Sequence, residues 1–243
     1  MSRATPSPST LRARRALAAA AAAAWAVLAE RADAARPLST DDAQVQAPHQ
    51  CELDSYAGAE TARALPAAQA ISVQLGCGVG ARTSLGLAYA RSFDDGDTPQ
   101  TLALVGKTAV LSSGSDADPQ AALAWGEVGR KVRGTAFRYD GWYATLVGQL
   151  PLGTWTVLGN LGATAEHAGR AVTLRWSAAL TDTLPGDVVL GAEALGDDRH
   201  VGALLQAGGA VPVTGGLTAN ASWGLHTGRE HDRIVTAGLT WGF

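Results

Sequence analysis

The chain ends in Val235-Thr236-Ala237-Gly238-Leu239-Thr240-Trp241-Gly242-Phe243, and this stretch decides the expected fold. Counting back from the last residue, alternate positions are apolar and finish in two aromatic residues, whereas the positions between them are small or polar. Because successive side chains point to opposite faces of a β-strand, one face of this strand suits lipid and the other suits a polar interior. The stretch therefore predicts a membrane-spanning β-strand.

The same alternation recurs upstream, most clearly in 217–226 and 171–180. Segments of this kind, separated by turn residues, run roughly over 51–56, 68–77, 83–91, 101–111, 121–132, 141–151, 154–166, 171–180, 187–195, 202–213, 217–226 and 233–243. A soluble sandwich also alternates, but it needs a bulky inward face, whereas here the bulky face opposes glycine, alanine, serine and threonine. The pattern predicts an all-β, transmembrane, antiparallel up-and-down barrel of twelve strands, with ten or fourteen as alternatives.

The connections between these segments are of two kinds that alternate along the chain. One kind is short and rich in proline and glycine, as in Pro151-Leu152-Gly153 and Pro185-Gly186-Asp187. The other is charged, as in Asp94-Asp95-Gly96-Asp97 and Asp197-Asp198-Arg199-His200. Short turns on one rim and polar loops on the other are typical of the periplasmic and extracellular ends of outer-membrane barrels. The connection over 112–119 is the exception, since it is longer than a tight turn.

The N-terminus has the three parts of a secretory signal peptide. Arg12, Arg14 and Arg15 form a basic cluster, an apolar run covers 16–29, and Ala32-Asp33-Ala34 fits a small-x-small cleavage site. The apolar run is shorter than the roughly 20 residues that span a bilayer. We therefore expect a signal peptide over 1–34 cleaved near Ala34 or Ala35, a short periplasmic segment over 35–50 and a barrel over 51–243.

Combined with a signal peptide and this alternation, the C-terminal stretch resembles the assembly signal of Gram-negative bacterial outer-membrane β-barrel proteins. The residues that carry the resemblance are Phe243, Trp241 and Leu239, at alternating positions from the end. The resemblance implies a location in the outer membrane, insertion by the barrel-assembly machinery, and contact with membrane lipid and lipopolysaccharide. It identifies no subfamily and no substrate.

Two cysteines, Cys51 and Cys77, occur in a chain expected to be exported, and an even pair in such a chain favours a disulfide. Cys51 opens an upward strand and Cys77 closes the following downward one, so both are expected at the same rim. Two free thiols remain the alternative, and no neighbouring group indicates a reactive thiolate.

Charged and polar side chains at mid-strand positions predict the lining of the lumen. The candidates are Lys107, Arg175, Glu193, Gln74, Glu127 and Lys131. They either set the charge preference of a channel for small solutes or pair with one another inside a sealed barrel. Twelve strands enclose more space than side chains alone fill, although loops or a plug from 35–50 could block it.

These observations favour a small passive channel for small polar solutes. The alternatives are a sealed structural or adhesion barrel that acts through its extracellular loops and, third, a lipid-modifying enzyme. No histidine has a serine two residues away, so the sequence predicts no catalytic residues. The histidines and aspartates near the strand ends show no metal-ligand spacing, and we expect no cofactor and no metal. A net charge of −3 with 17% charged residues gives no indication of nucleic-acid binding.

Overall fold

The computed structural model describes residues 38–61, 68–93, 98–112, 117–132, 134–166, 172–199, 202–227 and 233–243. The expected signal peptide over 1–34 and the charged loop residues 94–97 lie outside these ranges. No helix in the described part of the chain is long and apolar enough to cross a membrane.

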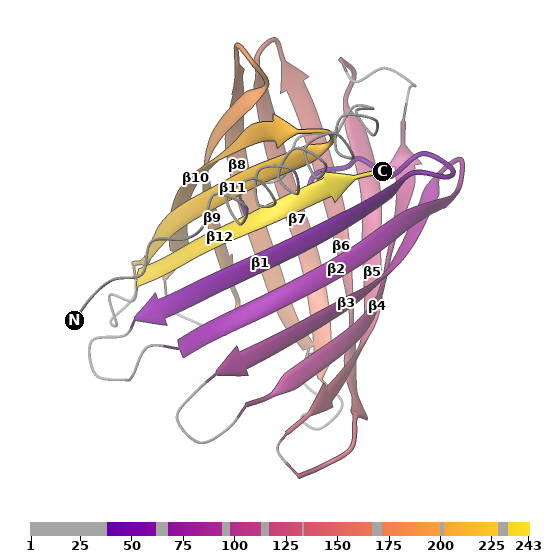
Figure 1. Ribbon diagram of the computed structural model, residues 1–243, viewed down its shortest axis with the longest axis vertical. Helices are drawn as coiled ribbons and strands as arrows, with labels where there is room; N and C mark the ends of the chain where they lie inside the picture. The colour runs from indigo at the N-terminus through magenta and orange to yellow at the C-terminus, as the bar shows by residue number, and fades with distance from the viewer. Residues whose placement is uncertain are drawn as a thin grey trace, which may run out of the picture.

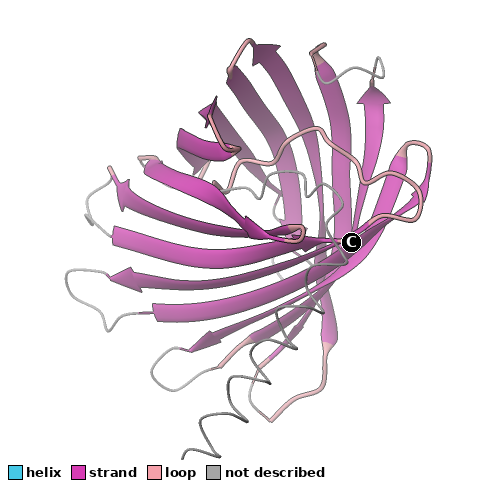
Figure 2. Ribbon diagram, turned by 45° about the horizontal axis from the view of Figure 1, so that its top comes forward, coloured by secondary structure: helices cyan, strands magenta, loops and turns pink. Residues whose placement is uncertain are grey.

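The described residues form twelve antiparallel strands that close into a barrel, which confirms the expected fold (Figures 1 and 2). The strands are β1 (Cys51–Thr61), β2 (Ala68–Gly80), β3 (Thr83–Phe93), β4 (Gln100–Leu111), β5 (Gln120–Lys131), β6 (Arg138–Leu152), β7 (Trp155–Glu166), β8 (Val172–Leu184), β9 (Val188–Asp197), β10 (Leu204–Thr214), β11 (Leu217–His226) and β12 (Arg233–Gly242). Each strand pairs with its sequence neighbours, and β1 pairs with β12. The strands lean strongly across the barrel (Figure 1).

The two ends of the chain's strand region meet at one rim. The amide nitrogen of Cys51 donates to the carbonyl of Phe243 at 2.7 Å, and that of Phe243 donates back at 2.9 Å. We call this the terminal rim, and the opposite rim, which carries Thr61 and Arg233, the loop rim. The tight turns lie at the terminal rim, and the turn at Gly215-Gly216 has φ of 55° and 78°. Two consecutive residues with positive φ are the geometry of a two-residue hairpin turn, for which glycine is suited.

The wall of the barrel has an apolar outer face and a polar inner face. In β11 the residues Thr218, Asn220 and Ser222 are buried, whereas Ala221 and Trp223, on the opposite face, are exposed. The same parity holds in β12, where Leu239 and Trp241 lie on the outer face and Thr240 on the inner face. The barrel is therefore inside-out relative to a soluble protein, with its polar groups toward the lumen.

The first strand is longer than the sequence predicts, extending to Thr61 rather than ending near Tyr56. Its second half, which includes Gly58 and Ala59, is small and carries no strong alternation. It is held by pairing with β12 down to Arg233 and with β2. Pairing with remote strands, and not local propensity, sets the end of β1.

Candidate functional site

A stretch of chain that precedes β1 runs inside the barrel and forms the central feature of its lumen. The amide nitrogens of Ser39 and Thr40 each donate to the carboxylate of Glu193, on β9, at 2.7 Å. The hydroxyl of Thr40 donates to the same carboxylate. Thr40 is 1% exposed and Glu193 is 5% exposed, so this carboxylate is buried and satisfied by three donors from one stretch of chain. We call residues 38–50 the lumen segment.

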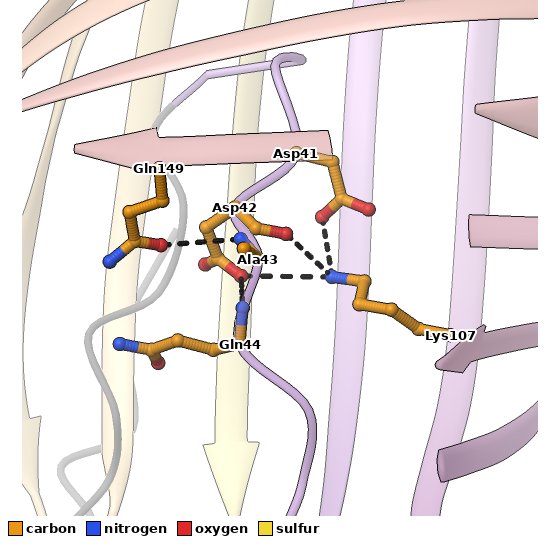
Figure 3. Close-up of polar contacts among 6 residues, drawn as sticks. All are labelled: Asp41, Asp42, Ala43, Gln44, Lys107 and Gln149. Atoms are coloured by element: carbon orange, nitrogen blue, oxygen red, sulfur yellow. Dashed lines mark hydrogen bonds and ion pairs between the residues drawn. The ribbon is translucent and has the colours of Figure 1, made fainter. Parts of the chain in front are cut away.

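The next two residues of the lumen segment bind the opposite wall (Figure 3). The Lys107 ammonium, from β4, lies 2.8 Å from Asp41 Oδ1 and 3.6 Å from Asp42 Oδ1, and it donates to the Asp42 carbonyl at 3.1 Å. Hydrogen bonds between charged groups are stronger than neutral ones. The positive charge that the wall contributes here is therefore compensated by the lumen segment.

Backbone groups of the lumen segment are also matched by side-chain amides of the wall. Gln149 Oε1 accepts from the Ala43 amide nitrogen at 3.2 Å. With its amide turned to satisfy both atoms, Asn160 donates to the Asp41 carbonyl at 3.0 Å and accepts from the Asp41 nitrogen at 2.7 Å. Ala43 itself is buried against Ala122, Ala124 and Val147. Contacts from β4, β5, β6, β7 and β9 together fix the path of the segment.

The lumen segment reaches the terminal rim beside Gly78 and turns back into β1. A Cβ atom at Gly78 would lie 2.1 Å from the Ala47 carbonyl oxygen, so no larger residue fits there without movement of the backbone. The Gly78 nitrogen donates to the Gln50 carbonyl at 2.9 Å, and Pro48 forms a parallel bridge with Gly78. The segment is thus anchored at both its inner end and its exit.

The lumen segment narrows the lumen without filling it. A cavity of about 700 Å³ lies along β1 to β3, and a second of about 260 Å³ continues toward the terminal rim. Both are lined by Ser39, Asp41, Asp54 and Gln74, so they adjoin. A third cavity of about 400 Å³ lies on the other side and is lined by polar residues that include Arg175.

Four of the predicted lumen residues lie on the inner face, and two do not. Gln74, Lys107 and Arg175 line cavities, and Glu193 binds the lumen segment. Lys107 and Glu193 therefore hold a part of the chain itself. Whether any of the four sets a preference for solutes stays a prediction.

The prediction that Glu127 and Lys131 line the lumen is wrong. Glu127 lies opposite Leu104 and Trp142, which are 46% and 43% exposed on the outer face. Lys131 lies opposite Gln100, which has the same parity as Leu104, and its ammonium is 5.8 Å from the Phe137 ring. The inner positions in the middle of β5 are small residues, whereas Glu127 and Lys131 lie on the outer face toward the loop rim.

The predicted disulfide between Cys51 and Cys77 is confirmed. The two residues are direct register partners in β1 and β2, at the terminal rim. The bond links the first hairpin next to the point where the lumen segment leaves the barrel.

Sequence reasoning missed the groups that dock the lumen segment, namely Ser39, Thr40, Asp41, Asp42, Gln149 and Asn160. Ser39, Thr40, Asp41 and Asp42 fall within the stretch 35–50 that the sequence offers as a candidate plug, whereas no sequence pattern singles out Gln149 or Asn160. Of the loop residues with histidine and aspartate, His167, His200, His231 and Asp232 lie outside the described residues. Within the described ranges, no three His, Cys, Asp or Glu side chains gather as a metal site.

No protein-family model matches this sequence, and no curated protein is similar to it. Among solved structures, a KdgM porin has a TM-score of 0.55 at 8% identity, over 78% of this chain and 99% of that one. A KdgM porin in complex with disordered oligogalacturonate has a TM-score of 0.56 at 8% identity, over 79% and 99%. The translocator domain of the autotransporter NalP from Neisseria meningitidis has 0.49 at 14% identity, over 96% and 95%. The likeness to the porins shows a shared barrel fold.

Proposed function

We propose that the chain is an outer-membrane barrel that passes small polar solutes along a lumen narrowed by its own lumen segment. The observation that carries the proposal is the pair of adjoining cavities beside that segment, about 700 and 260 Å³ in volume. They extend from Glu60 near the loop rim to Glu52 near the terminal rim. A space that reaches from one rim toward the other, lined by small apolar residues together with polar and charged ones, suits passive diffusion.

The outer face supports a location in a membrane. Large apolar side chains are exposed on every strand from β2 to β12, and aromatic residues gather near both rims. Those near the loop rim are Phe93, Tyr139, Trp142, Trp176 and Trp223, and those near the terminal rim are Trp155, Trp241 and Phe243. An apolar band between two aromatic girdles is the surface of a transmembrane barrel.

Leu161→Arg is expected to destabilise the barrel by about 2–4 kcal/mol, because it places a charge in the apolar band. Leu161 is 63% exposed in the middle of β7. The control is Ser177→Arg, on the adjacent strand β8 but on the inner face, where a charge remains in contact with water. Urea unfolding of the refolded protein in lipid vesicles measures both, and equal losses for the two variants would contradict a lipid-facing outer surface.

The proposed transport is tested by single-channel recording of the refolded protein in a planar bilayer. We expect a small, steady conductance in KCl, and Arg175→Ala should shift the ion preference toward cations, since it removes a positive charge from the third cavity. Lys107→Ala should raise the conductance, because it removes the ion pairs that hold Asp41 and Asp42 of the lumen segment against the wall. A heat-modifiable, folded barrel that passes no current would overturn the proposal.

The second candidate is a sealed barrel that acts through its loops, and the docked lumen segment favours it. Such a barrel needs its lumen blocked, and wall residues from several strands hold the segment in place. Bilayer recording separates the two candidates.

Oligogalacturonate, bound in one of the similar porin structures, is not the cargo we propose. Its repeating carboxylates would meet Asp54 and Glu60, which line the larger cavity of this barrel. Like charges at short range repel one another, most strongly where water is limited.

A further inference from the structure

We infer that the cavity of about 700 Å³ binds small hydroxylated amines, of which an amino sugar is the simplest representative, and favours cations over anions. This inference deepens the proposed function and rests on it for the transport of such a solute. The binding site itself is defined by the side chains that line the cavity.

The charge of this cavity is negative. Asp54 and Glu60 project from the inner face of β1, and Asp41 lines the cavity from the lumen segment. Among the described residues that line the cavity there is no lysine or arginine. Asp41 is paired with Lys107, whereas Asp54 accepts a hydrogen bond from the neutral hydroxyl of Thr240. Glu60 lies 3.9 Å from His226 Nε2 at the loop rim. The wall therefore attracts cations and repels anions.

Two buried amides give the cavity unused hydrogen-bonding capacity. Gln206 is 5% exposed and Asn220 is 6% exposed, and both line the cavity. Gln206 Oε1 and Asn220 Nδ2 are buried and have no hydrogen-bond partner within the protein. A buried polar atom without a partner costs about 1–3 kcal/mol, and native structures hold few of them. Both side chains line the cavity, so rotation of their amide groups turns one acceptor and one donor toward a hydroxyl-bearing solute.

Size and ring chemistry agree with the same class of ligand. The volume of about 700 Å³ lies within the range of roughly 300–1,000 Å³ that is typical of small-molecule sites. Tyr56 also lines the cavity, and its ring lies against the wall, since a Cβ at Gly238 would lie 2.4 Å from a Tyr56 ring carbon. An aromatic face near carboxylates adds a cation–π contribution for an ammonium group.

Three sugars of similar size but different charge test the inference: glucosamine, N-acetylglucosamine and glucuronate. Saturation-transfer NMR on the refolded full barrel, at pH 7 so that the amine of glucosamine is mostly protonated while a free imidazole is mostly neutral, measures their binding without requiring conduction. We expect glucosamine to bind at least about tenfold more tightly than glucuronate, a difference of about 1.4 kcal/mol, with N-acetylglucosamine between them. Equal binding of the three, or none, would overturn the inference.

Variants separate the two parts of the site. Asp54→Asn combined with Glu60→Gln should abolish the preference for glucosamine over N-acetylglucosamine and lower the cation selectivity of the reversal potential in a KCl gradient. Asn220→Ala should weaken the binding of both glucosamine and N-acetylglucosamine while leaving the ion selectivity unchanged. The matched control is Glu127→Gln, which neutralises a carboxylate on the outer face and should change neither measurement.

The outcomes also distinguish this inference from the proposed function. A barrel that conducts but shows no cation preference and no glucosamine binding overturns the inference alone. A barrel that binds glucosamine but passes no current overturns the channel and leaves the binding site. Cation selectivity without binding of any sugar reduces the site to an inorganic cation pathway and overturns the assignment of a hydroxylated ligand.

Discussion

Deleting residues 38–46 is expected to raise the conductance of the barrel several-fold. The deletion removes the part of the lumen segment that separates the cavities of about 700, 260 and 400 Å³, which then join into one lumen. It leaves Ala47 to Gln50 in place at the terminal rim, together with the disulfide that follows. Single-channel recording in a planar bilayer measures the change. If the wild-type barrel is sealed, only the deletion variant will conduct.

Two controls distinguish the expected change in conductance from the effects of misfolding. Heat-modifiable migration on a gel shows whether the deletion variant still forms the barrel. The double substitution Asp41→Ala and Asp42→Ala keeps the chain length and removes the carboxylates that pair with Lys107, while the bond from Lys107 to the Asp42 carbonyl remains, so a smaller increase in conductance is expected. An unchanged conductance in a folded deletion variant would show that the lumen segment does not limit passage.

The strands could be predicted from the sequence because their signals are local. The alternation in β11 and β12 depends only on residues within each strand, and the glycines at 215 and 216 mark a turn without any tertiary information. The pairing of Cys51 with Cys77 follows from the same logic, since adjacent antiparallel strands of similar length place their connected ends together at one rim and their free ends together at the other.

The orientation of β5 could not be predicted because its charges break the expected pattern. Charged side chains at mid-strand positions predict a lumen face for Glu127 and Lys131. The structure places both within a few residues of the loop rim, where long charged side chains reach the interface. The inner face in the middle of β5 is instead small, with Ala122 and Ala124 buried against Ala43.

The docking of the lumen segment could not be predicted because its partners are remote. Glu193 is more than 150 positions from Ser39 and Thr40 in the chain, and Gln149 is 106 from Ala43. No spacing in the sequence records contacts of that range. Strand alternation places Lys107 and Glu193 on the lumen face, but their role as docking groups depends on the barrel closing around the segment.

Glu193→Ala is expected to release the inner end of the lumen segment while leaving the barrel folded. The carboxylate accepts hydrogen bonds from two amide nitrogens and one hydroxyl of Ser39 and Thr40. A hydrogen bond to a charged group contributes about 1.5–3 kcal/mol, so losing two or more costs the docked state about 3–6 kcal/mol. The equilibrium constant for undocking should therefore rise by about 10²- to 10⁴-fold.

The same substitution should leave the free energy of unfolding of the barrel wall unchanged or raise it. A carboxylate that is only 5% exposed carries a desolvation cost, and removing it relieves that cost in the wall. Hydrogen exchange at the Ser39 and Thr40 amides measures docking, and urea unfolding of the refolded barrel measures the wall. Glu193→Gln keeps an acceptor and should accelerate exchange less, whereas Glu127→Ala on the outer face should not accelerate it. Unchanged protection of both amides in Glu193→Ala would show that the other contacts hold the segment without this carboxylate.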